Sequence, residues 1–340
     1  MKKRILHFLP FFVLFCLAAD CQPGELFFHH LNVENGLTET ENLFFLKDSK
    51  GFVWISSGGG LNRYDGHEIK PYFPDPDLQE HTMLGAVIQS PFFEDDDSNI
   101  WFSTYRGLNC YIRASDSFKN FTFSTEDEPL RDYYAMELDE RGQLWVIVAG
   151  QLVLFDIKSE RWKPQYELMT EARRLYVDFR QDGSPRQLFA SLFTKPGMLH
   201  VVYTNDHTYR RDTLFQSDDD EMALTIRDVY VEQENLVWMA TDEGLFRYNP
   251  LNRDLKKTTR FQRKTIENVR SVEPYRDSLL LATSMEDGLL IFNKTQNRFV
   301  RAYRHHPAAP YSLASNFANN VQVLDDGIWV AVNNVGVDFT

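Results

Sequence analysis

The chain has 340 residues, which is enough for two average domains or one large all-β domain, and 43% of them are hydrophobic and 14% aromatic. The 36 Lys and Arg against 49 Asp and Glu give a net charge of -13. This acidity argues against nucleic acid or an anionic membrane surface as the main partner. The three cysteines, Cys16, Cys21 and Cys110, form neither a disulfide framework nor a metal-spaced pair. No metal or other cofactor is expected.

The first residues, "MKKRILHFLPFFVLFCLAADCQPG", predict a secretory signal peptide over residues 1–21. Three basic residues precede an apolar run that is shorter than the ~20 residues of a membrane-spanning helix. Cys21 would suit a lipoprotein, but Asp20 stands where a small residue normally precedes the lipidated cysteine, so lipidation is disfavoured. We expect residues 22–340 to be exported to the periplasm.

One short signature recurs along the whole remaining chain. "LKDSKGFVWISSGGGLNRYD" is echoed by "FEDDDSNIWFSTYRGLNCYI", "LDERGQLWVIVAGQLVLFD", "VEQENLVWMATDEGLFRYN" and "QVLDDGIWVAVNNVGVDF". Two weaker copies, with Phe or Leu at the Trp position, lie between them. The seven centres are spaced roughly 42 to 50 residues apart, as expected for one propeller blade per repeat. They are Trp54, Trp101, Trp145, Phe189, Trp238, Leu280 and Trp329.

Each repeat predicts four strands. An alternating apolar segment ends in an Asp/Gly/Asn corner, a strand with the Trp follows, and a Gly marks the turn into a third strand. A fourth strand, such as "SFKNFTF", lies on the outer rim. The sequence therefore predicts an all-β, seven-bladed β-propeller of four-stranded antiparallel blades. Two packed β-sandwiches are the alternative, but they do not explain why one Trp-to-Gly-Leu signature returns so often.

The two ends of the chain predict how the ring closes. The seventh repeat stops at "GVDFT" after its third strand, and the apolar residues 26–31, "LFFHHL", precede the first repeat without belonging to it. We expect this N-terminal segment to become the outer strand of the last blade, which removes an exposed sheet edge.

The repeat "ENLFFLKDSKGFVWISSGGGLNRYDG" resembles the two-component regulator propeller repeat. That pattern is roughly an apolar strand, Asp-x-x-Gly, Leu-Trp-Ile-Gly-Thr, a short loop and Gly-Leu-Asn-Arg-Tyr-Asp. The resemblance implies the periplasmic sensor part of a Bacteroidetes hybrid two-component system, which detects glycan breakdown products and signals to a cytoplasmic histidine kinase. The sequence holds no second propeller, kinase motif or receiver domain, so we expect it to act with further sensor or kinase domains or with a partner protein. A homodimer stays open.

Several motifs that suggest chemistry have simpler structural explanations. The Gly cluster of "SGGGLNRYDG" follows a strand and enters another strand, where a phosphate loop would need a helix. The adjacent pairs His29-His30 and His305-His306 would point to opposite faces of a strand, which disfavours a shared metal. The acidic runs at 94–99 and 217–221 lack calcium-hand spacing and are interpreted as solvated turns. The five Trp residues are expected to form core between blades.

The candidate ligand contacts come from the loops between the second and third strands, because one set of propeller loops converges on the axial mouth. An aromatic ring together with amides and charges suits a polyhydroxylated ligand. These candidates are Tyr105, Arg106, Asp242, Glu243, Glu286, Asp287, Asn333 and Asn334. Ordinary polar turns remain an alternative explanation for them.

The sequence therefore predicts a ligand-sensing or ligand-binding propeller that is not itself an enzyme, with an oligosaccharide as the expected ligand. No recognisable catalytic motif is present, although Asp242 and Glu286 keep open a glycosidase or polysaccharide lyase. A protein-binding scaffold is the third alternative.

Overall fold

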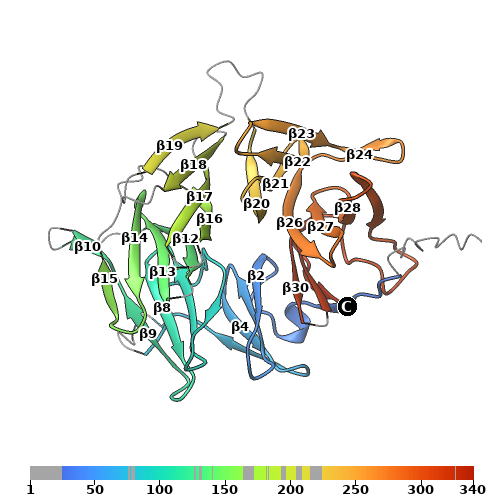
Figure 1. The fold of residues 1–340 in the computed structure, drawn as a ribbon. Coiled ribbons are helices and arrows are strands. Elements are labelled where there is room, and N and C mark those ends of the chain that lie inside the picture. Colours follow the sequence, from blue (N-terminus) through green and yellow to red (C-terminus); the bar gives the residue numbers. More distant parts are fainter. Residues whose placement is uncertain are drawn as a thin grey trace, which may run out of the picture.

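The computed structural model describes residues 25–340 except 76, 78–80, 126–127, 130–131, 140, 164–171, 181, 183, 193–196, 204–208, 215–223 and 326. The predicted signal peptide therefore lies outside the described residues. Seven four-stranded antiparallel sheets surround a central axis (Figure 1). This arrangement confirms the predicted seven-bladed propeller. Two short hairpins lie between blades, β10 (Ser124–Thr125) with β11 (Glu128–Pro129) and β24 (Arg260–Phe261) with β25 (Lys264–Thr265).

The first six blades run from the axis outward in chain order. Blade 1 contains β2 (Asn42–Lys47), β3 (Val53–Ser57), β4 (Gly60–Tyr64) and β5 (Ile69–Tyr72). Blade 2 contains β6 (Phe93–Glu94), β7 (Ile100–Thr104), β8 (Gly107–Ile112) and β9 (Ser117–Phe121). Blade 3 contains β12 (Tyr133–Leu138), β13 (Gln143–Val148), β14 (Gln151–Asp156) and β15 (Arg161–Lys163). Blade 4 contains β16 (Ala172–Phe179), β17 (Pro185–Leu192), β18 (Met198–Tyr203) and β19 (Tyr209–Leu214). Blade 5 contains β20 (Ile226–Gln233), β21 (Leu236–Thr241), β22 (Gly244–Asn249) and β23 (Asp254–Thr258). Blade 6 contains β26 (Val269–Tyr275), β27 (Leu279–Ser284), β28 (Gly288–Asn293) and β29 (Arg298–Tyr303).

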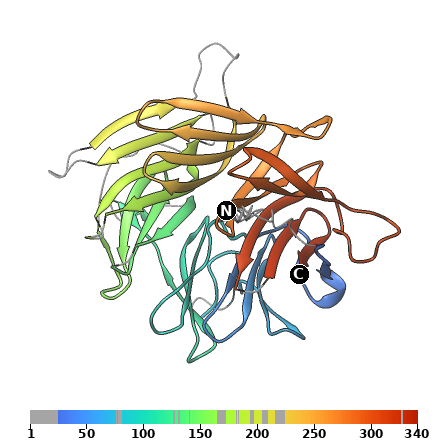
Figure 2. The same ribbon diagram turned by 45° about the vertical axis from the view of Figure 1, so that its right-hand side comes forward.

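The seventh blade is built from both ends of the described chain. Its inner strands are β30 (Ala318–Leu324), β31 (Gly327–Val332) and β32 (Gly336–Phe339), and its outer strand is β1 (His29–Leu31). His29 pairs with Phe339 and Leu31 with Val337, so the blue N-terminal strand lies beside the red C-terminal strands (Figure 2). The predicted closure is confirmed, with a strand shorter than 26–31. The short 3-10 helix η1 (Val33–Asn35) then leads into blade 1.

The Asp of the repeat connects the first turn of a blade to its Trp. In blade 1, one carboxylate oxygen of Asp48 accepts hydrogen bonds from the backbone N–H groups of Lys50 and Phe52, at 2.9 and 3.0 Å. The other oxygen accepts the indole N–H of Trp54 at 2.8 Å. A carboxylate with these partners fixes both the turn and the ring orientation. The equivalent pairs are Asp95 with Trp101, Asp139 with Trp145 and Glu232 with Trp238.

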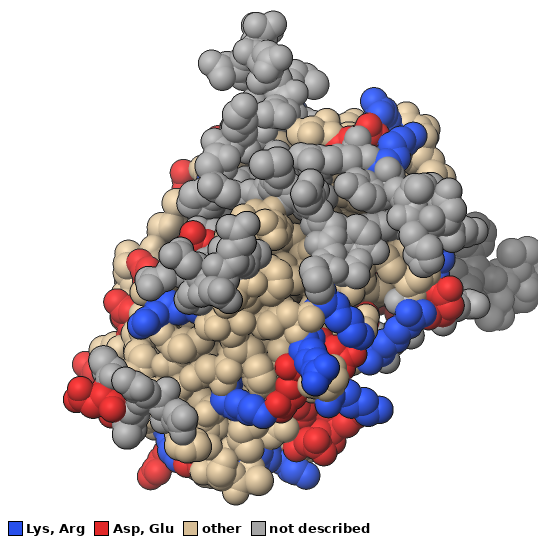
Figure 3. All heavy atoms as spheres, turned by 90° about the vertical axis from the view of Figure 1, so that its left-hand side faces the viewer, with Lys and Arg blue, Asp and Glu red and all other residues tan. Residues whose placement is uncertain are grey.

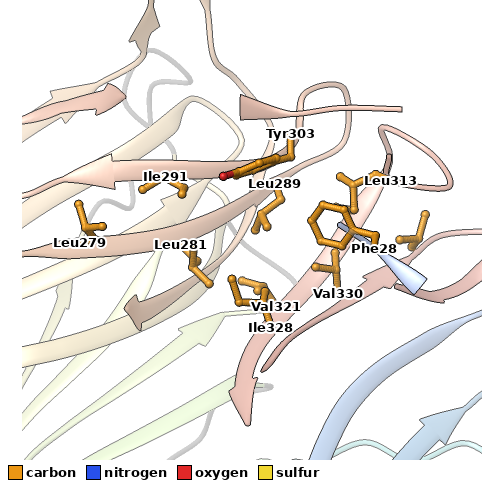
Figure 4. Packing of buried hydrophobic residues seen from close by; sticks show 12 residues of the cluster. Phe28, Leu279, Leu281, Leu289, Ile291, Tyr303, Leu313, Val321, Ile328 and Val330 are labelled. Atoms are coloured by element: carbon orange, nitrogen blue, oxygen red, sulfur yellow. The ribbon is translucent and has the colours of Figure 1, made fainter. Parts of the chain in front are cut away.

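The Trp residues are core between blades, as expected. Trp54 is fully buried and packs at 4.7 Å from the Tyr111 ring of blade 2. Phe28 from the closing segment lies among the side chains between blades 6 and 7 (Figure 4). In blade 6 the side chain that points toward blade 7 is Leu281, whereas Leu280 packs with Trp238 on the side of blade 5. The repeat centre in this blade thus lies one residue beyond Leu280.

The outer rim carries charges of both signs. On the side where blades 3 and 4 lie, basic and acidic side chains alternate over the described surface (Figure 3). Lys119 pairs with Glu160 of the next blade, and Lys163 pairs with Asp156 at 2.7 Å. Exposed pairs of this kind contribute at most ~1 kcal/mol each. The ion pairs of the rim are therefore exposed to solvent and contribute little to the stability of the fold.

Candidate functional site in the axial cavity

A cavity of about 390 Å³ lies on the propeller axis, and residues from the inner strands or inner segments of all seven blades wall it. Figure 1 shows these strands, among them β2, β12, β16, β20, β26 and β30, around the centre of the ring. A volume of this size falls within the range of roughly 300 to 1,000 Å³ that is typical of small-molecule sites. The cavity is therefore the candidate functional site.

The inner strands aim equivalent side chains at the cavity because most of them begin with a bulge. In β12, for example, the pairing with β13 shifts between Tyr133 and Ala135, and in β20 it shifts between Ile226 and Asp228. The same irregularity occurs at the start of β2, β16, β26 and β30. A bulge bends a strand and re-aims the side chains that follow it.

One position of each inner strand pairs with the Trp position of the second strand, and we call its occupant the facing residue. From blade 1 to blade 7 the facing residues are Leu46, Phe93, Glu137, Tyr176, Tyr230, Glu273 and Gln322. All except Leu46 line the cavity. Two residues earlier, on the same face of each strand, Phe44, Pro91, Ala135, Arg174, Asp228 and Asn320 also line it. Polar groups therefore gather on the side of blades 3 to 7.

Glu137 is the cavity carboxyl group without a compensating contact. Protein atoms surround it almost completely, and burial raises its pKa to about 8. No hydrogen bond or ion pair of this side chain occurs within the described part of the chain. A carboxyl group with such a pKa is mostly protonated at neutral pH and can donate a hydrogen bond, whereas an ordinary glutamate is ionised there.

The other charged groups of the cavity interact with one another. Burial raises the pKa of Glu273 to about 8, and the nearby Asp228 carboxylate adds to the shift. Burial also raises the pKa of Asp228, but the charge of Arg174 opposes that shift. The Arg174 guanidinium lies 4.8 Å from the centre of the Phe44 ring, in a cation–π contact. The cavity thus holds three carboxyl groups and a single described cation.

Some of these polar groups also have a structural role. The innermost strand of each blade is a sheet edge whose N–H groups need partners. The Val272 N–H donates to the Asp228 carboxylate at 3.1 Å, and the Phe45 N–H donates to the Gln322 side chain at 2.6 Å. The Val323 N–H hydrogen-bonds to Glu273. Asp228, Glu273 and Gln322 each bridge to the next blade, so Glu137 differs from them in having no such role.

The loop residues predicted from the sequence lie away from this cavity. Tyr105 and Arg106 are exposed in the β7–β8 loop, and the Tyr105 carbonyl accepts the Asp132 N–H at 2.7 Å. In the β21–β22 loop, Asp242 accepts the Thr225 N–H at 3.1 Å and Glu243 pairs with Lys257 at 2.5 Å. The Asp242 and Glu243 side chains thus have partners within their own blade or its linker.

The loops of blades 6 and 7 hold the other four predicted residues. Glu286 is exposed, but Asp287 is buried between Lys264 and Arg304, each at 2.8 Å. Asn333 accepts a hydrogen bond from Asn319 at 3.2 Å, and Asn334 is exposed with a left-handed backbone. The structure connects the loops of blades 5 and 6 through Asn268, whose N–H donates to the Asp242 carbonyl at 2.7 Å. None of the eight described loop residues lines the axial cavity.

The cavity residues were not predicted from the sequence, although the first strands of the repeats contain a signal for them. Glu137 and Glu273 each stand eight positions before the residue at the Trp position, where blades 1 and 2 have Leu46 and Phe93. Aligning the first strands of the repeats, and not only the Trp-to-Gly segments, reveals acids in place of apolar residues. An ionisable residue in an otherwise apolar strand is a candidate for function.

No group of three or more His, Cys, Asp or Glu side chains in the described part of the chain is arranged to hold a metal ion. None of the described helices has the length and apolar character needed to cross a membrane.

Comparison with known proteins gives the fold. No family model and no curated protein matches the sequence. Among solved structures, the chain is similar to the extracellular domain of a protein described as hybrid two-component system BT3049 of B. thetaiotaomicron, with a TM-score of 0.73 and 19% identity over 93% of this chain and 42% of that one. The corresponding domain of BT4673 from the same organism gives a TM-score of 0.69 and 18% identity, over 93% of this chain and 40% of that one.

A third solved structure comes from a different setting. PorZ, described as an essential surface component of the type-IX secretion system of Porphyromonas gingivalis, gives a TM-score of 0.66 and 14% identity over 89% of this chain and 46% of that one. The chain spans less than half the length of these three neighbours. The resemblance to two-component regulator propellers is thus confirmed at the level of the fold.

Proposed function

We propose that the chain is an exported ligand-binding propeller that serves as the input of a signalling system and takes a glycan-derived oligosaccharide in its axial cavity. The observation that carries this proposal is the cavity wall, where carboxyl, guanidinium, carboxamide and phenol groups converge, among them Glu137, Arg174, Asn320 and Tyr230. Sugars are held by such combinations, because aromatic rings stack on their apolar faces and charged groups form strong hydrogen bonds with their hydroxyls.

The neighbours support the sensory part of the proposal. Two of them are described as extracellular domains of two-component systems, and the repeats resemble those of periplasmic sensors. We extend this to a periplasmic location and to signalling through a histidine kinase, carried either on a longer chain or by a partner protein. The non-enzymatic character and a homodimeric assembly belong to the same proposal.

A calorimetric titration of the purified chain against oligosaccharides released from a panel of polysaccharides tests the proposal. Saturable binding is expected, and Glu137→Gln should weaken it about tenfold or more. Glu286→Gln is the matched control, because it makes the same change in a loop outside the cavity. Loss of binding in the Glu286 variant alone would favour the loop site, and absence of binding to the whole panel would refute the proposal.

A polysaccharide-cleaving enzyme is a second candidate, and one specific observation favours it. Burial raises the pKa values of both Glu137 and Glu273 to about 8, so each can carry a proton at neutral pH as a general acid must. A reducing-sugar assay on the same panel separates the two functions. Turnover that disappears in Glu137→Gln would establish an enzyme, whereas binding without turnover supports a sensor.

A further inference from the structure

The charge balance of the axial cavity points to the class of ligand. The wall carries the carboxyl groups of Glu137, Asp228 and Glu273, and Arg174 is the single cation among the described residues that line it. Arg174 acts on Asp228 and lies over the Phe44 ring. If all these groups are ionised, the cavity holds two uncompensated negative charges. Such charges are costly away from bulk water unless a cation joins them.

Glu137 is the carboxyl group of the wall that has no hydrogen-bond or ion-pair partner among the described residues. Asp228 and Glu273 accept backbone N–H groups of the following blade, from Val272 and Val323. Glu137 occupies the facing position equivalent to Glu273 but has no hydrogen-bond partner among the described residues. It is almost fully surrounded by protein atoms, yet it lines the cavity. Water or a ligand in the cavity can therefore supply a partner for its carboxyl group.

A tyrosine side chain interacts with this carboxyl group across the cavity wall. Tyr176, the facing residue of the next blade, interacts electrostatically with both Glu137 and Tyr230. All three side chains line the cavity. Carboxylates combined with the faces of aromatic rings are the groups that recognise an ammonium ion, because ring quadrupole and anion both attract it.

We propose that the axial cavity selects a ligand with a positively charged amine, such as an unacetylated amino sugar, whose ammonium group lies against Glu137. This inference rests on the proposed function, since it names the ligand class of the same cavity. Binding forms no covalent bond. The amine keeps its protons, and the Glu137 carboxyl group ionises and releases its proton to solvent. Proton release on binding is thus a signature that a neutral sugar would not produce.

Three disaccharides that differ only at carbon 2 test the ligand class. The β1–4-linked glucosamine dimer carries ammonium groups, cellobiose carries hydroxyl groups, and N,N′-diacetylchitobiose carries neutral amides. Titration of the full chain at pH 5.5, where the amino groups of the dimer are ammonium ions and the Glu137 carboxyl group still carries its proton, should show the glucosamine dimer binding at least about ten times more tightly than cellobiose. Repeating the titration in two buffers of different ionisation enthalpy should give a release of close to one proton per ligand, since the carboxyl group is mostly protonated beforehand.

Variants locate the effect. Glu137→Gln should remove both the preference for the amine and the proton release. Glu68→Gln is the matched control, because Glu68 is exposed on a turn of blade 1 and should leave both unchanged. Equal binding of cellobiose and the glucosamine dimer would overturn the amine inference while leaving a carbohydrate site in place. Binding of none of the three would overturn the inference, and the polysaccharide panel would then decide the proposed function separately. An amine preference that persists in Glu137→Gln would also overturn the inference.

Discussion

Two positions of the repeat, paired across the first two strands of each blade, follow opposite rules. The Trp position is nearly uniform: five blades carry Trp, and its side chains are buried between blades. The facing position varies from Leu46 and Phe93 to Glu137 and Gln322. Uniform residues build the ring, whereas varied residues line the space it encloses. We therefore expect ligand specificity to depend on the residues at the facing position.

The largest expected effect tests the Trp side of this comparison. Trp54→Ala removes a fully buried ring that packs on Tyr72 and Tyr111 and leaves Asp48 without its indole partner. The free energy of unfolding should fall by about 3–5 kcal/mol. Leu46→Ala, at the facing position of the same blade and only half-buried, should cost clearly less. Urea denaturation of both variants checks the difference, and equal losses would remove the distinction between the two positions.

The next largest effect concerns ring closure. Gly336 has a φ of 141°, and a Cβ on it would lie 2.1 Å from the carbonyl oxygen of Leu31 in the closing strand. Gly336→Ala must push β1 away, at a cost of about 2–4 kcal/mol from strain and lost pairing. Gly51→Ala is the control, since Gly51 has a φ of 89° with open space around it, and only about 1 kcal/mol is expected there. Limited proteolysis and denaturant melts measure both.

Comparable losses in the two glycine variants would show that closure by β1 contributes little. A larger loss of stability in the Gly336 variant would show that the N-terminal strand, like the Trp residues, helps to hold the ring together. Closure would then matter to stability as the Trp residues do.

Most of the fold could be predicted because the Asp, Trp and Gly of each repeat have one dominant physical role. Asp48 fixes a turn and a ring whatever the ligand, so its spacing to Trp54 is visible in the sequence. In blade 6 the Trp is absent, and the prediction fell on Leu280 one residue before Leu281, because a run of three leucines gives no register.

The cavity could not be predicted as easily. In the sequence, Glu137 looks like one more charged residue beside a turn. What distinguishes it is that no described residue pairs with it, and this depends on how neighbouring blades pack. The loops between the second and third strands, in contrast, contain Asp287, whose buried carboxylate forms ion pairs with Lys264 and Arg304. Sequence alone does not separate a charge that faces solvent from one that holds the fold together.

An effect of similar size but opposite sign tests the facing position. The folded protein holds the Glu137 proton more tightly than the unfolded chain, so the folded state loses stability as pH rises from the ordinary Glu value of about 4.3 toward 8. Gln does not titrate, so Glu137→Gln should be more stable than the parent by on the order of 2–4 kcal/mol at pH 8 and about equal at pH 4. Thermal melts across pH measure the gap, with Glu68→Gln as the control. A gap that does not change with pH would contradict the buried carboxyl group.

The smallest expected effect comes from a titratable pair in the seventh blade, which the N-terminal strand closes. If this strand has only a structural role, its contribution to stability should not depend on pH. His30 on β1 lies with Nδ1 at 2.6 Å from the Asp338 carboxylate and Nε2 at 3.1 Å from the Pro310 carbonyl. Both partners are acceptors, so the ring satisfies both as an imidazolium. Burial alone would lower the His30 pKa, but these hydrogen bonds outweigh it and raise the pKa.

The contribution of His30 is therefore complete below the ordinary His pKa of about 6.5 and is lost as pH rises through the raised value. Burial also raises the pKa of Asp338, despite the Ala314 N–H and the charges of His30 and His305, so the effect of Asp338 on stability begins above the ordinary Asp value of about 3.9, at lower pH than that of His30. Between pH 6.5 and 8.5 the parent should lose about 1 kcal/mol more than His30→Gln, an amount kept small by the partial exposure of the pair. Denaturation curves at several pH values measure this difference. Parallel profiles would show that His30 does not titrate with a raised pKa in this range and would contradict its pairing with Asp338.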